Sequence, residues 1–390
     1  MKCFVTCLGG ENIKGEKRML GGIWKKHKFP IAVDVSNRSV RLLQAELNHN
    51  RLSVASASEA SLSCAEHRED DRYEKILCEG ISQAISAGSF VGNHAVLCLP
   101  AARVSVKHMR LPQMPADELP MAVKWEASQR FGYTEDSHVL QFYGAGEVLQ
   151  GDEVREEIII FSVKKAQVDQ YINVFDELNM VLGGIEVDAA SLLRWAAYRG
   201  KPNAKSAEIE VDAEVIIDVG QYQTSVLIHR HGRVVFYKVI EINGHRFDRE
   251  LSDHLNIPVN EAHDLRMRHC DAGDEFGADR ILKEKAQETL RNIAAELARE
   301  IGLCLRYFSV TFRGKRPEVV TLIGSEISQK WLTEIIENQC GVSIHTENAL
   351  DVLDSKAEAE KLLLLDSNMA WATSIGLSLR NGVSLQKGAA

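Results

Sequence analysis

Two separate stretches of the chain alternate apolar and polar residues in the same order. Each starts with an apolar run that ends at an Asp, passes through a short polar turn, and returns as further strand-like segments. The first stretch covers residues 31–54, and the second, IIDVGQYQTSVLIHRHGRVVF, covers residues 216–236. Alternation with a period of two, interrupted by polar turns, predicts β-strands joined by hairpins. The sequence therefore predicts one strand-and-turn unit that occurs twice.

The first unit is followed by a predicted helix at residues 73–87 and a strand at 95–99, which makes the order β-β-β-α-β. A different block follows at residues 103–183. Its pattern predicts a strand at VSVKHMRLP, a helix at 117–131, a strand at EEIIIFSV and a helix at 167–182 that stops at two glycines. This block interrupts the repeated organisation.

After the second unit the pattern becomes mainly helical. It predicts helices at residues 246–255, 284–308 and 328–339, a strand at 319–323, and a last helix at 369–379. The longest helix carries one apolar stripe, formed by Leu290, Ile293, Leu297, Ile301 and Leu305. The last helix contains Gly376, which costs about 1 kcal/mol relative to Ala unless close packing needs it.

Composition and charge exclude several classes of protein. A net charge of −9 and a pI near 5.9 give no electrostatic footprint for DNA or RNA, which argues against a nucleic-acid partner. No apolar run is long enough to span a bilayer, so we expect the body of the chain to be cytoplasmic. The eight cysteines include no CxxC pair, and the histidines show no metal-binding spacing, which argues against a zinc site.

The segment 1–29 has a composition of its own, with seven Lys or Arg against two Glu. Such a segment is either a solvated tail or a weak contact with anionic lipid, in which Trp24 and Phe29 enter the interface. We expect it to be dispensable for folding.

Gly220 is the most informative residue of the second unit. A glycine just after a strand lets the backbone approach a phosphate, and the hydroxyls of Thr224 and Ser225 add donors. Asp218 is placed to hold Mg²⁺ through water. Two such hairpins, one in each half, would close on a nucleotide from opposite sides. The alternative is a pair of ordinary hairpins in which Asp and Gly are turn residues.

The order of the elements resembles the superfamily of actin, Hsp70 and sugar kinases. The chain is most similar to one branch, the PilM family of type IV pilus assembly proteins, over about residues 29–380. The segments that carry this resemblance are VSVKHMRLPQMPADELPMAVKWEASQRFGYTEDSHVLQF, IIDVGQYQTSVLIHRHGRVVFYKVIEINGHRFDREL, VTLIGSEISQKWLTEII and MAWATSIGLSLR.

The resemblance implies an α/β, actin-like fold of two duplicated ribonuclease H-like halves with inserted subdomains. The first half would comprise residues 30–102, 184–212 and the helix 369–381, with the insertion 103–183. The second half would comprise 213–245 and 315–368, with the insertion 246–314, and residues 1–29 would form a basic tail.

The resemblance also implies that ATP and Mg²⁺ bind between the halves. The phosphate-binding residues would be Asp34, Ser36, Asn37, Arg38 and Ser39 in the first loop, Asp218, Gly220, Gln221, Thr224 and Ser225 in the second, and Gly244 beside them. Gly324, Ser325 and Glu326 would hold the adenosine. Asp34 and Asp218 would hold Mg²⁺ through water, and Glu186 would orient the attacking water.

This chain departs from the family pattern at two of its loops. Ser36 stands where the family usually has glycine, and a single Gly324 followed by Ser325-Glu326 replaces three glycines. Added side chains reduce the room for phosphate, and a carboxylate beside phosphates repels them. The departures predict weak ATP binding and slow hydrolysis at most.

In such relatives the protein is a scaffold that docks the cytoplasmic N-terminal peptide of a bitopic membrane protein, PilN. The corresponding groove here would be lined by Val104, Val106, Met109, Leu111, Val123 and Trp125. A bland alternative is that Trp125 and Phe131 belong to the core of the inserted block. Alternative functions are an active ATPase, a small-molecule kinase, or an FtsA-like filament former that self-associates.

Overall fold

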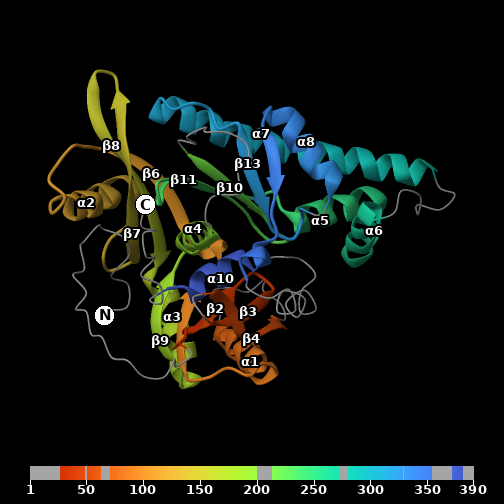
Figure 1. Ribbon diagram of the computed structural model, residues 1–390, viewed down its shortest axis with the longest axis horizontal. Helices are drawn as coiled ribbons and strands as arrows, with labels where there is room; N and C mark the ends of the chain where they lie inside the picture. The colour runs from red at the N-terminus through yellow and green to blue at the C-terminus, as the bar shows by residue number, and fades with distance from the viewer. Residues whose placement is uncertain are drawn as a thin grey trace.

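The computed structural model describes residues 27–48, 51–62, 71–199, 213–271, 280–327, 329–353 and 371–380. These residues form three β-sheets with helices packed around them (Figure 1). In this view the first sheet lies at the bottom, the second lies above it, and the smallest sheet stands on the left.

The first sheet has the strand order β1-β3-β2-β5-β9, with β4 paired to β3. Its strands are β1 (His27–Lys28), β2 (Ile31–Val35), β3 (Ser39–Asn48), β4 (Arg51–Ser61), β5 (His94–Cys98) and β9 (Val181–Glu186). Alternation along β2 sends Ile31 and Val33 toward α1 (Asp71–Ala87) and α3 (Lys165–Glu177), whereas Ala32 faces the core shared with α4 (Asp188–Arg199). The two sides of the sheet are therefore both buried.

The second sheet repeats this plan with the order β12-β11-β10-β13-β14. Its strands are β10 (Glu214–Val219), β11 (Thr224–Arg230), β12 (Arg233–Ile240), β13 (Val319–Ile323) and β14 (Ser343–Thr346). In both sheets the first strand of the repeated unit pairs with an antiparallel hairpin on one side and a parallel strand on the other. The repeat predicted from the sequence is confirmed.

Four helices accompany the second sheet among the described residues, namely α5 (Gly244–Leu255), α6 (Val259–Asp271), α7 (Arg280–Phe312) and α8 (Lys330–Cys340). The predicted apolar stripe of α7 is buried, since Leu290, Ile293, Leu297, Ile301 and Leu305 are each at most 2% exposed. The amphipathic pattern alone was sufficient to orient this helix.

The third sheet belongs to the inserted block and has the order β6-β8-β7. It consists of β6 (Ser105–Pro112), β7 (His138–Gln150) and β8 (Glu153–Lys164), and α2 (Leu119–Phe131) packs on it through Val123 and Ala127. The sheet also contacts β12 and α7 of the second half. Short 3-10 turns lie at η1 (Ala101–Arg103) and η2 (Ala349–Val352).

Several elements differ from the sequence prediction. The helix predicted at 167–182 ends at Glu177, because the chain turns at Asn179 (φ 54°) and Val181 pairs with the strand beside it as β9. The strands β7 and β14 and the helix α6 had no counterpart in the prediction. The sequence of α6, VNEAHDLRMRHCD, has few apolar residues, so its periodicity is weak.

The last helix, α10 (Ala372–Ser378), crosses α4 at very short range. A Cβ on Gly376 would collide with the carbonyl oxygen of Ser191, and the Gly376 carbonyl accepts a 2.8 Å hydrogen bond from Arg194 Nε. Close packing therefore explains a glycine inside this helix.

Candidate functional site

A cavity of about 1450 Å³ lies where the hairpin turns of the two halves meet. The predicted nucleotide-binding residues that line it are Asp34, Ser36, Asn37, Arg38, Ser39, Asp218, Gly220, Gln221, Ser225 and Ser325. Thr224, Gly244, Gly324 and Glu326 lie behind the wall rather than on it. The topology thus brings both copies of the repeated unit to one cavity.

The two turns that enter the cavity are built alike. In the first, the Ser36 N–H donates to the Ser39 carbonyl at 2.9 Å, and in the second the Gly220 N–H donates to the Gln223 carbonyl at 2.8 Å. Ser36 is therefore the positional equivalent of Gly220. Its hydroxyl bonds within the turn, accepting from the Ser39 N–H at 3.1 Å, so the extra side chain braces the loop instead of crossing the cavity.

Among the six carboxylate residues that line the cavity, Asp34 and Asp188 lie close enough to Asp218 for their charges to act on it. Burial raises the pKa of Asp34 from 3.8 to about 6. Burial and the neighbouring charges of Asp188 and Asp34 raise the pKa of Asp218 from 3.8 to about 7. The Ser374 hydroxyl donates to Asp34 at 3.1 Å, whereas Asp218 Oδ1 is buried without a hydrogen-bond partner among the described residues.

A divalent cation fits this arrangement, because it would compensate the repulsion and engage the unpartnered oxygen of Asp218. No group of three or more His, Cys, Asp or Glu in the described ranges has the geometry to ligate a metal directly. The role of Asp34 and Asp218 in holding Mg²⁺ through water stays a prediction.

Sequence reasoning missed Asp188, the first residue of α4. Its carboxylate accepts hydrogen bonds from the Tyr237 hydroxyl at 2.5 Å, the Ser225 hydroxyl at 3.0 Å and Gln223 Nε2 at 2.5 Å. Burial raises the pKa of Asp188 above its usual value even though these donors lower it. Asp188 therefore joins the first half to three residues of the second.

Glu186, the carboxylate predicted at this position, does not line the cavity. It is 2% exposed and pairs with Arg194 at 2.6 Å and with Arg380 at 3.6 Å. Glu186 is the last residue of β9 and Asp188 the first of α4, so the point where β9 ends decides which of them reaches the cavity. The acidic position on the wall is corrected to Asp188.

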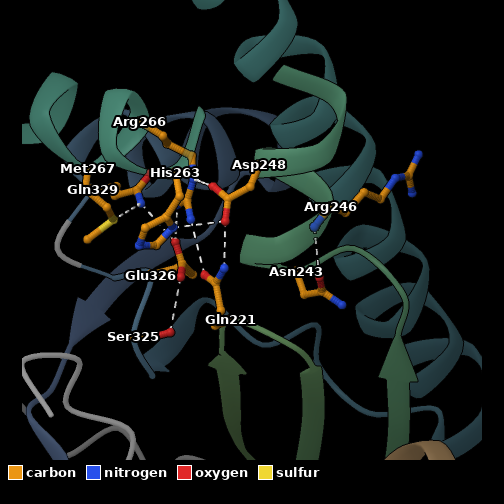
Figure 2. A network of polar contacts seen from close by, with 10 residues as sticks. All are labelled: Gln221, Asn243, Arg246, Asp248, His263, Arg266, Met267, Ser325, Glu326 and Gln329. Atoms are coloured by element: carbon orange, nitrogen blue, oxygen red, sulfur yellow. Dashed lines mark hydrogen bonds and ion pairs between the residues drawn. The ribbon is translucent and has the colours of Figure 1, made fainter. Parts of the chain in front are cut away.

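The other end of the cavity is closed by a polar network around Arg266 (Figure 2). Arg266 on α6 is fully buried, donates to Asp248 of α5 at 2.6 Å, and pairs with Glu326. Gln221 donates to Asp248 at 2.6 Å and accepts from Arg266 at 3.2 Å. His263 lies 3.0 Å from Asp248. The network ties the second hairpin turn to α5, α6 and the loop after β13.

Charge compensation within the network shifts the pKa values of its members. Burial alone raises the pKa of Asp248, but the hydrogen bond from His263 and the charge of Arg266 bring it below the usual value. The hydrogen bond to Asp248 raises the pKa of His263. Glu326 faces Arg266 and accepts from Gln329 at 2.9 Å. Its carboxylate is therefore held by Arg266 and Gln329, and its effect on nucleotide binding stays a prediction.

Gly324 is required where it stands. Its φ is +106°, and a Cβ there would meet Asp218 Oδ1 and the Val219 carbonyl. One glycine of this loop thus keeps the space beside the acidic wall clear.

The residues predicted for a partner groove fall into two groups. Met109, Leu111 and Val123 are at most 4% exposed and form the core between β6 and α2, so they do not line a surface groove. Alternation along β6 and the inner face of α2 account for this correction. Val104 and Val106 are partly exposed, and Trp125 is 64% exposed. The alternative reading of Trp125 as a core residue is wrong.

The inserted sheet touches the cavity region through Tyr237. The Tyr237 hydroxyl binds Asp188 inside the cavity, while its carbonyl lies 3.1 Å from Nε2 of His108 on β6. Glu157 on β8 extends this contact, since it accepts from Tyr307 of α7 at 2.6 Å and pairs with Arg110 at 2.8 Å. Strand β12 therefore connects the cavity directly to the inserted block.

Comparison with known proteins supplies a family. A family model described as type IV pilus assembly protein PilM matches residues 32–382. Within the described ranges, no helix is both long and apolar enough to cross a lipid bilayer.

Among solved structures, the chain is similar to the PilM-PilN type IV pilus biogenesis complex, at 17% identity over 90% of this chain and 98% of that chain, with a TM-score of 0.70. It also matches the ethanolamine utilization protein EutJ from Carboxydothermus hydrogenoformans, at 10% identity over 91% and 90% of the two chains, with a TM-score of 0.48. The second score is too low to carry an argument. The first, with the repeated sheets, confirms the actin-like α/β fold.

Proposed function

The chain belongs to the PilM family of type IV pilus assembly proteins, and from this we propose that it is a nucleotide-binding scaffold of a pilus assembly platform. The observation that carries the proposal is the family match over residues 32–382. We place the protein in the cytoplasm at the inner membrane. We also propose that the chain consists of two halves with insertions at residues 103–183 and 246–314.

We propose that Mg·ATP binds in the cavity between the halves. The turns at Ser36–Ser39 and Gly220–Gln223 would face the phosphates, and Asp34 and Asp218 would hold Mg²⁺ through water. The adenosine would bind at the end of the cavity that is formed by α5 and α6. Supporting this, the cavity joins both turns and has an acidic wall that a cation would compensate.

The bonding of Asp188 favours a scaffold over an active enzyme. A general base needs a carboxylate oxygen free to accept a proton from water or a hydroxyl. Both oxygens of Asp188 already accept hydrogen bonds, from Tyr237, Ser225, Gln223 and the Ala189 N–H. We therefore expect hydrolysis to be slow, with Asp188 acting mainly as a brace between the halves.

Mg·ATP should raise the melting temperature of the wild-type chain, and Gly220→Val should abolish the rise. A Cβ at position 220 would meet the Gln223 carbonyl at 3.0 Å and distort the phosphate-facing turn. At about ten times Kd, binding stabilises by about 1.4 kcal/mol, a shift of about 2 °C for a chain of 390 residues.

The matched control is Gly302→Ala in α7, where an added Cβ has only Cys340 Sγ within 4.0 Å. This variant should keep the full shift. A wild type that shows no shift at millimolar Mg·ATP would remove the nucleotide from the proposal and leave the family assignment intact.

We further propose that the cytoplasmic N-terminal peptide of a PilN-like bitopic membrane protein docks on the inserted block. The related solved complex pairs a PilM with a PilN. In the described part of this chain, β6 pairs with β8 alone, so its other edge is open to an added strand. Pro112, Pro115 and Pro120 stiffen the path from β6 to α2, which favours a preformed site.

Peptide binding should weaken at least about tenfold in Val106→Asp or Trp125→Ala, because Trp125 is an exposed aromatic anchor and a charge at the half-buried Val106 would disturb β6. The measurement is fluorescence anisotropy of the labelled N-terminal peptide of the membrane protein. Ser128→Ala on α2 serves as the control for a change on the same helix, and Gly220→Val should leave the affinity unchanged. Equal affinity in all four variants would contradict this docking site.

A further inference from the structure

The outward face of α7 carries a regular row of residues that neither the cavity nor the inserted block uses. The row, called here the α7 stripe, consists of Arg299, Leu303, Arg306, Val310 and Arg313. Alternating spacings of four and three residues place the first four on one side of the helix, and Arg313 follows directly after its last residue, Phe312, with a φ of 49°. All five are exposed, and the two aliphatic side chains, Leu303 and Val310, are 46% and 72% exposed.

The α7 stripe is positively charged without local compensation. Arg299, Arg306 and Arg313 form no ion pair with another residue in the described ranges. Two acids of the same helix are engaged elsewhere, since Glu296 pairs with Arg246 at 2.7 Å and Glu300 pairs with Lys238 at 2.8 Å. In a chain of net charge −9, this face therefore stands out as a local basic surface.

The chemistry of the α7 stripe favours phosphate over a partner helix. A row of residues that packs against a second helix is apolar at every contact position. In the α7 stripe, arginine alternates with the aliphatic residues. A guanidinium offers a planar fork of donors that matches phosphate oxygens. Its aliphatic stem can lie beside Leu303 and Val310 on an apolar boundary.

We propose that the α7 stripe is a contact surface for the headgroups of anionic phospholipids in a bilayer. From Arg299 to Val310 the helix rises about 17 Å, so the row can lie flat along the headgroup layer. The contact is weak and salt-sensitive, because each basic residue near an anionic surface contributes only modestly and is screened. It would orient the protein on a membrane without anchoring it.

The α7 stripe is independent of the contacts proposed above. It lies on the face of α7 opposite the buried row of Ile301 and Leu305, so it needs neither nucleotide nor peptide. It is also separate from the basic segment 1–29, whose expected lipid contact falls mostly outside the described residues.

The test is co-sedimentation of the full chain with vesicles of equal parts phosphatidylglycerol and phosphatidylcholine, compared with phosphatidylcholine alone. The double variant Arg299→Glu, Arg306→Glu should reduce the fraction bound to the anionic vesicles at least about tenfold in partition coefficient. The control, Lys285→Glu with Arg291→Glu, makes the same charge change at exposed positions in the N-terminal half of α7. Leu303→Gln should reduce binding less.

Loss of binding in the stripe variant but not in the control supports the proposal. Three results would overturn it: equal wild-type binding to both kinds of vesicle, unchanged binding in the stripe variant, or equal loss in stripe and control variants. Soluble glycerol phosphate should not compete, since the proposal is for a row of headgroups rather than one phosphate. The assay contains neither the peptide nor the nucleotide, so its outcome does not test the proposed scaffold function.

Discussion

Replacing Arg266 with Met will lower the free energy of unfolding by about 3 to 5 kcal/mol, because it leaves the buried Glu326 carboxylate without its cation and leaves Asp248 with His263 as its remaining basic partner. Asp248 and Glu326 are 1% and 2% exposed, and both bond to the Arg266 guanidinium. Burying a charge without its partner is costly, and the cost should be largest at Glu326 because Asp248 lines the cavity. The measurement is urea denaturation at neutral pH.

Arg306→Met is the matched control, because Arg306 is exposed and outside any described ion pair. It should change stability by no more than about 0.5 kcal/mol. Adding Asp248→Asn and Glu326→Gln to Arg266→Met should recover part of the loss, since neutral amides replace the stranded charges. A loss below about 1 kcal/mol in Arg266→Met would show that the network contributes little to stability.

Asp218→Asn will stabilise the unliganded protein at pH 8 and have almost no effect at pH 4. The folded-state pKa of Asp218 is about 7, whereas its ordinary value is 3.8. Between these values the folded protein holds a proton that the unfolded chain has released, so stability falls as pH rises from about 4 to about 7. Above pH 7 the ionised Asp218 carries its full burial cost, which Asn does not.

A shift of about three pKa units corresponds to a gain of up to about 4 kcal/mol at pH 8. Asp34, with a pKa of about 6, contributes in the same direction in both proteins, and because its charge acts on Asp218 the difference between them includes that interaction. Melting temperatures of both proteins across this pH range provide the measurement. The variant should also lose any stabilisation by Mg·ATP. Parallel curves for the two proteins would mean that Asp218 is not held in a desolvated, repulsive site.

Local patterns were sufficient for the parts of the fold that depend on neighbours in the chain. The alternation before Asp34 and Asp218 and the polar turns after them predicted both hairpins, because side-chain period and turn chemistry are short-range properties. The apolar stripe of α7 was predicted for the same reason. The turn residues at the cavity were also predicted, since the repeated unit places them at equivalent positions.

Tertiary structure alone decided which charged groups reach the cavity and which are neutralised. Whether Glu186 or Asp188 lies on the wall depends on where β9 ends, and β9 forms only by pairing with β5. Glu326 is paired because α6 brings Arg266 to it across a separation of 60 residues. Met109 and Val123 are buried because α2 folds back on β6. The sequence by itself determined the repeated strand-and-turn unit and most of the helices. Burial and charge compensation depend on contacts between segments far apart in the chain, and a local sequence pattern does not indicate which distant residue will be the partner.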